Sequence, residues 1–216
     1  MAIPTIHPYP MPTEAELPAN VAAWYPVPDR AVVLVHDMQR YFVEAFPTGR
    51  PPVTDLVANV ARIVAAARRR GIPIVYTAQA GAASRERRGL LFDFWGPGMS
   101  AEPGPRAIVG DLAPAAGDVV LPKVRYSAFH ATGLAGTIRA TGRDQLVVCG
   151  VYAHVGCLAT AGDAFARDIR TFLVADAVAD MTAEHHRRAL EHAAATCAVV
   201  VTTDGLLAHF GEGVAR

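Results

Sequence analysis

Short apolar segments recur along the chain, and amphipathic segments separate most of them. The first, residues 31–35, is an unbroken apolar run with three valines. Such runs are typical of strands that are buried on both faces of a parallel sheet. Five more follow at 72–77, 118–121, 145–149, 171–175 and 198–202. Strands that alternate with helices, without hairpin signals, predict an α/β fold: a Rossmann-like, doubly wound parallel six-stranded sheet with helices on both faces.

The segment between the first two strands shows the helical pattern most clearly. Thr54 and Asp55 resemble a helix N-terminus, where a hydroxyl and a carboxylate can bind free N–H groups. Apolar residues then follow at helical spacing, and Gly71 fits the end of the helix. Further helices are predicted near residues 106–112, 134–140, 157–167 and 183–196.

Two segments depart from this alternation. Residues 1–30 contain seven of the sixteen prolines, which exclude long helices and central strands. We therefore expect a proline-rich N-terminal arm, lying on the domain or on a neighbouring subunit, and one domain over residues 31–216. Residues 80–105 form a long connection, and aromatic residues such as Trp95 favour an ordered, functional loop.

Composition and charge restrict the class of protein. Lys+Arg and Asp+Glu number 20 each, which argues against nucleic acid or a membrane surface as a partner. The apolar runs are too short to span a bilayer, and the N-terminus has no signal-peptide pattern. Three cysteines, an odd number without framework spacing, favour a reducing cytoplasm.

Polar residues follow four successive strands of the predicted sheet. They are Asp37, then Gln79, then Lys123 with Arg125 and Tyr126, and finally Tyr152 with His154. Right-handed crossovers bring the carboxyl ends of parallel strands to one edge, so these side chains can converge there. Taken singly, Asp37 would be a helix cap and Lys123 a surface residue. Together they favour a functional site.

These segments resemble the isochorismatase family, part of the wider cysteine-hydrolase group that includes nicotinamidases. The resemblance covers essentially the full chain. It is strongest to the single-domain phenazine-pathway 2-amino-2-deoxyisochorismate hydrolases and to siderophore isochorismatases. The segments that carry it are 36–42, 76–79, 93–98, 123–129, 142–146, 150–157 and 172–177.

The resemblance also implies the type of reaction. Alignment on residues 159–164 puts Gly156, not Cys157, where cysteine hydrolases carry their nucleophile, and Cys157 becomes a small buried residue. A glycine there is typical of the true isochorismatase branch, which protonates a vinyl ether, adds water and releases pyruvate without a covalent intermediate. The implied catalytic positions are Asp37, as the acid, Lys123 and Gly156.

The role of Asp37 carries an energetic condition. A free aspartate has a pKa near 3.9, so holding its proton at pH 7 costs roughly 4 kcal/mol. Burial beside Phe42 and Trp95 would raise this pKa, and Lys123 would lower it. We expect Lys123 to pair with the substrate as well as with Asp37.

The implied substrate is a small dicarboxylate, isochorismate or its 2-amino analogue. Arg88, with Lys123 and Arg125, is suited to hold its carboxylates. The backbone N–H groups of the turn at 152–156 lead into a helix N-terminus and offer an anion site. The predicted substrate-binding residues are Gln79, Arg88, Tyr126, Tyr152, Phe42, Trp95 and Val155.

The family resemblance further implies a homodimer and no cofactor. The eight histidines show no metal-ligand spacing, since His185 and His186 are adjacent and point in different directions on a helix. We therefore predict no metal. His154 is interpreted as a turn residue that holds backbone geometry.

Several alternatives remain open. The substrate can be isochorismate or 2-amino-2-deoxyisochorismate. Siderophore isochorismatases often carry a C-terminal aryl carrier domain, and the sequence ends at Arg216 without one, which favours the amino compound. An amidase-type cysteine hydrolase that uses Cys157 is a second hypothesis. A non-catalytic partner domain of a synthase complex is a third, and the presence of Asp37, Lys123 and Gln79 together argues against it.

Overall fold

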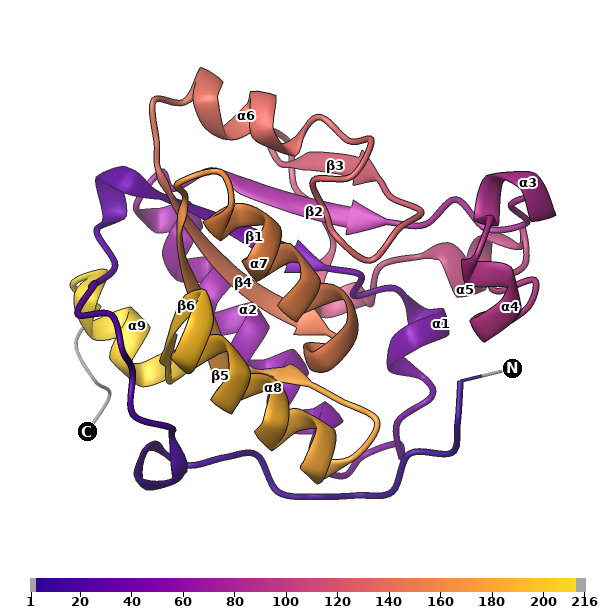
Figure 1. Ribbon diagram of the computed structural model, residues 1–216, viewed down its shortest axis with the longest axis horizontal. Coiled ribbons are helices and arrows are strands. Elements are labelled where there is room, and N and C mark those ends of the chain that lie inside the picture. The colour runs from indigo at the N-terminus through magenta and orange to yellow at the C-terminus, as the bar shows by residue number, and fades with distance from the viewer. Residues whose placement is uncertain (1–2, 213–216) are drawn as a thin grey trace.

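A six-stranded parallel sheet forms the centre of the computed structural model, which describes residues 3–212 (Figure 1). The strand order is β3-β2-β1-β4-β5-β6, and each neighbouring pair is parallel. The strands are β1 (Ala31–His36), β2 (Ile74–Ala78), β3 (Val119–Pro122), β4 (Gln145–Val151), β5 (Arg170–Ala179) and β6 (Ala198–Val201). The predicted α/β doubly wound fold is confirmed. The outer ends of the predicted arm and domain, residues 1–2 and 213–216, lie outside the described residues.

Helices cover both faces of this sheet (Figure 1). One face packs against α2 (Val53–Arg69) and α9 (Thr203–His209), and the other against α6 (Leu134–Ala140), α7 (Leu158–Phe165) and α8 (Ala183–Thr196). In β1, Val33 and Val35 belong to the first core, and Val32 and Leu34 to the second. Because side chains alternate along a strand, one unbroken apolar run fills two cores.

Shorter elements lie in the connections between strands and helices. They include α1 (Arg40–Val43), α3 (Arg85–Arg88), α4 (Leu91–Trp95), α5 (Pro103–Arg106), the 3-10 turns Glu14–Glu16, Pro28–Arg30 and Gly110–Leu112, and the π-helical turn Ala153–Cys157. The connection at 80–105 is thus ordered by three short helices. These helices gather at one end of the molecule, beyond the carboxyl ends of β2 and β3 (Figure 1).

The strand order creates a topological switch point between β1 and β4. The chain continues from β1 to β2 and β3 on one side, and from β4 to β5 and β6 on the other. In open α/β sheets, ligands bind outside the carboxyl ends of the strands at such a point. Asp37 follows β1 there and Tyr152 follows β4.

Three predicted elements differ in detail. Helix α2 begins at Val53 after Pro52, and the Thr54 hydroxyl donates to the Asp55 carboxylate rather than capping the backbone. Strand β5 continues to Ala179, because after a register shift it pairs again with β4 at Val151. The helix predicted near 106–112 is only the end of α5 and a 3-10 turn. Tertiary pairing and proline geometry, not local periodicity, decide these bounds.

The N-terminal arm lies along its own domain. It runs in extended form past α9 and α8 (Figure 1). The Tyr9 hydroxyl donates to the Asp180 carbonyl at 3.0 Å and accepts from the Asp180 N–H at 2.7 Å. The Asn20 side chain bonds both the N–H and the carbonyl of Val200, at 2.7 and 2.9 Å. These bonds attach the arm beside β5 and β6. Within residues 3–212, every helix is too short or too polar to cross a membrane.

Candidate functional site

Asp37 follows β1 in a backbone conformation that orients its carboxylate. Its φ angle is +49°, in the left-handed region that few non-glycine residues adopt. Its N–H donates to the Thr77 hydroxyl oxygen at 3.0 Å, and the Thr77 hydroxyl donates to Asp37 Oδ1 at 2.6 Å. Thr77 lies in the neighbouring strand β2 and is fully buried. Asp37 is therefore held by hydrogen bonds from strand to strand, and it does not cap a helix.

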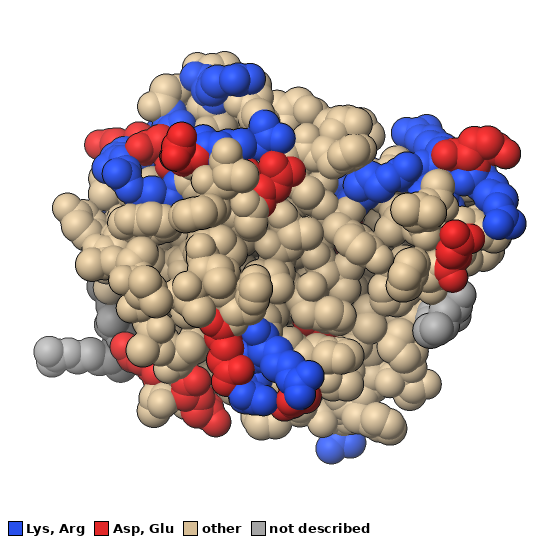
Figure 2. Space-filling model, in the orientation of Figure 1, with Lys and Arg blue, Asp and Glu red and all other residues tan. Residues whose placement is uncertain are grey.

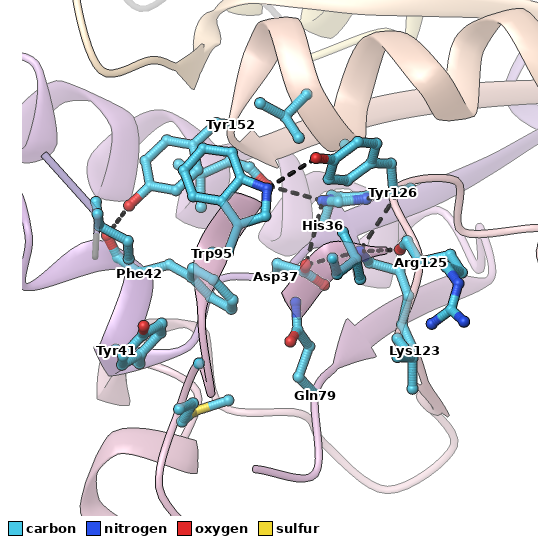
Figure 3. A pocket seen from close by; sticks show the side chains of 18 of the residues that line it. His36, Asp37, Tyr41, Phe42, Gln79, Trp95, Lys123, Arg125, Tyr126 and Tyr152 are labelled. Carbon is cyan, nitrogen blue, oxygen red and sulfur yellow. Dashed lines mark hydrogen bonds and ion pairs between the residues drawn. The ribbon is translucent and has the colours of Figure 1, made fainter. Parts of the chain in front are cut away.

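Lys123 forms a buried ion pair with Asp37. Its Nζ lies 2.8 Å from Asp37 Oδ2, and the two residues are 3% and 4% exposed (Figure 3). The same Nζ donates to the carbonyls of Arg125, at 2.8 Å, and Tyr126, at 3.4 Å. All three N–H bonds of the ammonium group are thus used within the protein. This geometry does not favour the predicted pairing of Lys123 with a substrate carboxylate, and it makes Lys123 the partner of Asp37.

The electrostatic environment determines the protonation state of Asp37. Burial raises its pKa, but the charge of Lys123, the proximity of His36 and hydrogen bonds from Lys123 and Thr77 oppose burial and prevail. The pKa of Asp37 is therefore lowered from its usual 3.8. In the ligand-free protein the group is a carboxylate at neutral pH, so any acid role requires ligand binding to change this balance.

A single pocket contains all ten predicted site residues. The space between its walls, with the open mouth included, is about 650 Å³. The structure thereby brings together Asp37, Phe42, Gln79, Arg88, Trp95, Lys123, Tyr126, Tyr152, Val155 and Gly156. Most of their side chains converge in Figure 3. Their individual roles stay predictions.

The pocket carries more positive than negative charge. Arg88 on α3 is 5% exposed, and its Nε donates to the Gly96 carbonyl at 2.7 Å. Within residues 3–212, neither Arg88 nor Arg125 has a carboxylate partner, whereas Lys123 is neutralised by Asp37. Figure 2 shows Lys and Arg side chains gathered over α3 at this end of the molecule. A buried guanidinium without an anionic partner is suited to bind a carboxylate ligand.

Gly98 provides the space for the Arg88 guanidinium. Its φ is +72°, and a Cβ on this residue would lie 2.7 Å from Arg88 Cζ. The predicted loop motif at 93–98 therefore has a packing role beside the pocket.

Aromatic side chains form the walls and mouth of the pocket. The Trp95 indole N–H donates to the Tyr126 hydroxyl at 2.7 Å, linking α4 to the loop after β3 (Figure 3). The Tyr152 hydroxyl donates to the Phe42 carbonyl at 2.9 Å, and the two rings meet edge to face at 6.1 Å. These contacts involve the connections that follow β1, β2, β3 and β4, and all four residues line the same pocket.

Gln39 holds the backbone of Gln79. Its amide N–H₂ donates to the Gln79 carbonyl at 2.9 Å, and its oxygen accepts from the Gln79 N–H at 2.7 Å. The Gln79 side chain is then free to point towards Asp37 (Figure 3).

The turn after β4 offers no nucleophile to the pocket. Gly156 lies in the π-helical turn, directly above the ring of His36. Cys157 is fully buried in the core beneath α7 and α8 and is absent from the pocket lining. Burial raises the pKa of its thiol well above the ordinary value. These facts disfavour an amidase that uses Cys157.

Some residues of the site did not emerge from the sequence. Ile3 and Met181 line the pocket, but they come from the arm and from the end of β5. Thr77 and His36 touch Asp37, and each is a polar residue in an otherwise apolar strand. A polar residue within an apolar strand was the sequence feature that could have identified these two residues as part of the site.

One cluster of possible metal ligands is not apparent from the spacing of the histidines in the sequence. Donor atoms of His154, Asp180 and His185 lie within 4.8 Å of one another. Asp180 accepts hydrogen bonds from the His154 N–H at 2.6 Å, from its Nδ1 at 2.6 Å and from the Met181 N–H at 2.7 Å. The carboxylate is thus satisfied by protein donors, and His154 holds the turn as predicted from the sequence.

Comparisons with known proteins agree with this geometry. A family model described as the isochorismatase domain matches residues 31–205. The phenazine biosynthesis protein PhzD1 of Pseudomonas aeruginosa is 55% identical over 205 residues, which cover 95% of this chain and 98% of that protein. An isochorismatase of Bacillus subtilis is 53% identical over 207 residues, 96% of this chain and 66% of that protein. The crystal structure of a cysteine hydrolase from Pseudomonas syringae superposes with a TM-score of 0.80 at 26% identity, covering 90% of this chain and 97% of that one.

Proposed function

This chain belongs to the isochorismatase family and is an isochorismatase-type hydrolase, and from that premise we propose that it releases pyruvate from 2-amino-2-deoxyisochorismate or isochorismate. The observation that carries the substrate class is the charge of the pocket. Arg88 and Arg125 line it, neither has a carboxylate partner among the residues that the structure describes, and the Asp37–Lys123 pair adds no net charge. Two free cations match the two carboxylates of either substrate.

Asp37 is the proposed acid. It transfers a proton to the terminal vinyl carbon, which leaves an oxocarbenium ion at the ether carbon. Water adds to this cation and loses a proton to the Asp37 carboxylate. The resulting hemiketal collapses to pyruvate and a ring alcohol, so one water is consumed and Asp37 is regenerated. No covalent bond to the protein forms, in accord with glycine at position 156.

Substrate binding must raise the pKa of Asp37, because the carboxylate is ionised at neutral pH without a ligand. A dianionic ligand places negative charge near Asp37 and displaces water, and both changes favour the protonated acid. Lys123 pairs with Asp37 Oδ2 at 2.8 Å, so the oxygen that takes the proton is Oδ1, the one that the Thr77 hydroxyl contacts. Lys123 thereby acts as an orienting residue for the acid.

The test measures pyruvate release from both substrates with a coupled lactate dehydrogenase assay. The native protein should release stoichiometric pyruvate from at least one of them. Asp37→Asn keeps the shape of the side chain but removes the acid, so kcat should fall by about 100-fold or more. Asp93→Asn is the matched control, because Asp93 is an exposed carboxylate on α4. Turnover by Asp37→Asn near the native rate would refute the acid assignment, and no pyruvate from either substrate would refute the function.

We also propose a cytoplasmic location and a homodimer. Three free, buried cysteines support a reducing compartment. Exposed apolar side chains at Leu90, Phe94 and Val120 support a contact between subunits. Light scattering tests the dimer, since a mass near 22.9 kDa would show a monomer.

A further inference from the structure

The imidazole of His36 lies where a side chain at position 156 would begin. A Cβ added to Gly156 would lie 2.8 Å from His36 Nε2, 3.1 Å from Nδ1 and closer still to Cε1. Such separations are shorter than carbon atoms tolerate, so position 156 cannot carry a side chain while the ring stays in place. The ring is 1% exposed and borders the pocket.

The ring cannot move aside easily. Its Nδ1 is 2.8 Å from the Val151 carbonyl oxygen, within hydrogen-bond distance. Its backbone is also enclosed, because a Cβ on Gly150 would lie 2.9 Å from the His36 N atom. Gly150 thus gives space to the backbone of His36, and Gly156 gives space to its side chain.

The hydrogen bonds indicate which form of the imidazole is present. A carbonyl only accepts, so the short contact to Val151 assigns the proton to Nδ1. Burial lowers the pKa of His36, and the charge of Lys123 lowers it further, although Asp37 and the Val151 carbonyl oppose this. The ring is then a neutral group 3.9 Å from the Asp37 carboxylate. Among the described residues, Lys123 is then the cation that contacts Asp37.

We propose that His36 is a positioning residue of this site: its imidazole fills the nucleophile position above Gly156, excludes a side chain there, and fixes the β4 turn beside Asp37. The effect on turnover rests on the proposed function. The effect on packing does not. In a hydrolase without a nucleophile, a residue of the adjacent strand can occupy the space that the nucleophilic side chain would need. Here His36 of β1 occupies that space.

A double-mutant cycle tests the packing. Gly156→Ala should force the ring out of place, lowering Tm by about 3–10 °C and kcat by about 100-fold. In a His36→Ala background the same Gly156→Ala substitution should change Tm by less than about 2 °C and kcat by less than about threefold, because the ring is gone. Gly162→Ala is the matched control, since a Cβ there meets no atom within 4 Å.

The cycle separates the two proposals. If the native protein releases no pyruvate, the proposed function fails, but the Tm values still report the packing. If Gly156→Ala lowers Tm and kcat as much in the His36→Ala background as in the native protein, His36 does not fill the position and the inference is overturned.

A pH profile distinguishes positioning from acid–base chemistry. His36→Asn can keep a donor to the Val151 carbonyl, so it should retain at least tenfold more kcat than His36→Ala. The limbs of its kcat profile should lie at the same pH as in the native protein, because a neutral residue replaces a neutral residue. Loss of a limb in His36→Asn would make His36 an acid–base residue and would overturn the positioning role.

Discussion

The hydrogen bond from Thr77 to Asp37 offers a quantitative test of the proposed acid. The Thr77 hydroxyl donates to Asp37 Oδ1 at 2.6 Å inside a fully buried site, so it stabilises the ionised carboxylate. Thr77→Val keeps the shape of the side chain and removes this donor. A hydrogen bond to a charged group contributes about 1.5–3 kcal/mol, and about 1.4 kcal/mol corresponds to one pH unit.

The sign of the effect follows from the role of Asp37. If Asp37 must be protonated in the substrate complex, kcat declines as pH rises through its pKa there. Loss of the Thr77 donor raises that pKa, so the alkaline limb of the kcat profile should move up by about one to two pH units. Thr77→Val also removes the acceptor for the Asp37 N–H, which should lower the unfolding free energy by about 1–3 kcal/mol.

The assay is pyruvate release between pH 5 and pH 10, with unfolding followed in urea for each variant. Thr77→Ser is the matched control, because it retains the hydroxyl and loses one methyl group, and its limb should stay within about 0.3 pH unit of the native position. A folded Thr77→Val protein whose alkaline limb stays in place, or moves to lower pH, would contradict protonation by Asp37.

Three further predictions follow from the same site. Arg88→Ala should raise KM by about 10–100-fold with a smaller change in kcat, because it removes charge-assisted bonds to a carboxylate; an unchanged KM would contradict this role. Cys157→Ala should leave kcat within about twofold, and a loss of turnover would revive the amidase hypothesis. The pKa values of His36 and His186 are lowered by burial, so the unfolded chain binds protons first below pH 6.5. The unfolding free energy should therefore decrease from pH 7.5 to pH 5, by at most about 1.4 kcal/mol per pH unit for each histidine, and a flat urea midpoint would contradict it.

The sequence predicted those parts of the fold that local patterns determine. The run at 31–35 identified β1 because both faces of that strand are buried, and the polar break at Asp37 identified the edge where the pocket lies. Lys123 and Gln79 were predicted at the same edge, because the carboxyl ends of parallel strands lie on one side of the sheet. The family match confirmed the resemblance that rested on these segments.

Other parts depend on contacts that no local pattern contains. The extension of β5 to Ala179 requires the renewed pairing with Val151, and Ile3 lines the pocket only because the arm folds back along the domain. The cluster of His154, Asp180 and His185 joins residues from two separate elements. The His36 ring occupies the space that a side chain on residue 156 would need, and the spacing of residues in a sequence does not reveal such an overlap.

The attachment of the arm has a consequence for the order in which the chain folds. Tyr9 and Asp180 are separated by 171 residues, yet Tyr9 bonds the backbone next to Met181, and Ile3 and Met181 both line the pocket. During synthesis the arm emerges first and has no docking surface until β5 and the residues after it have been made. The wall of the pocket is thus closed by a contact of very high sequence separation, which forms late and slowly. The arm is translated before every strand of the sheet, yet it is among the last segments to reach its native place.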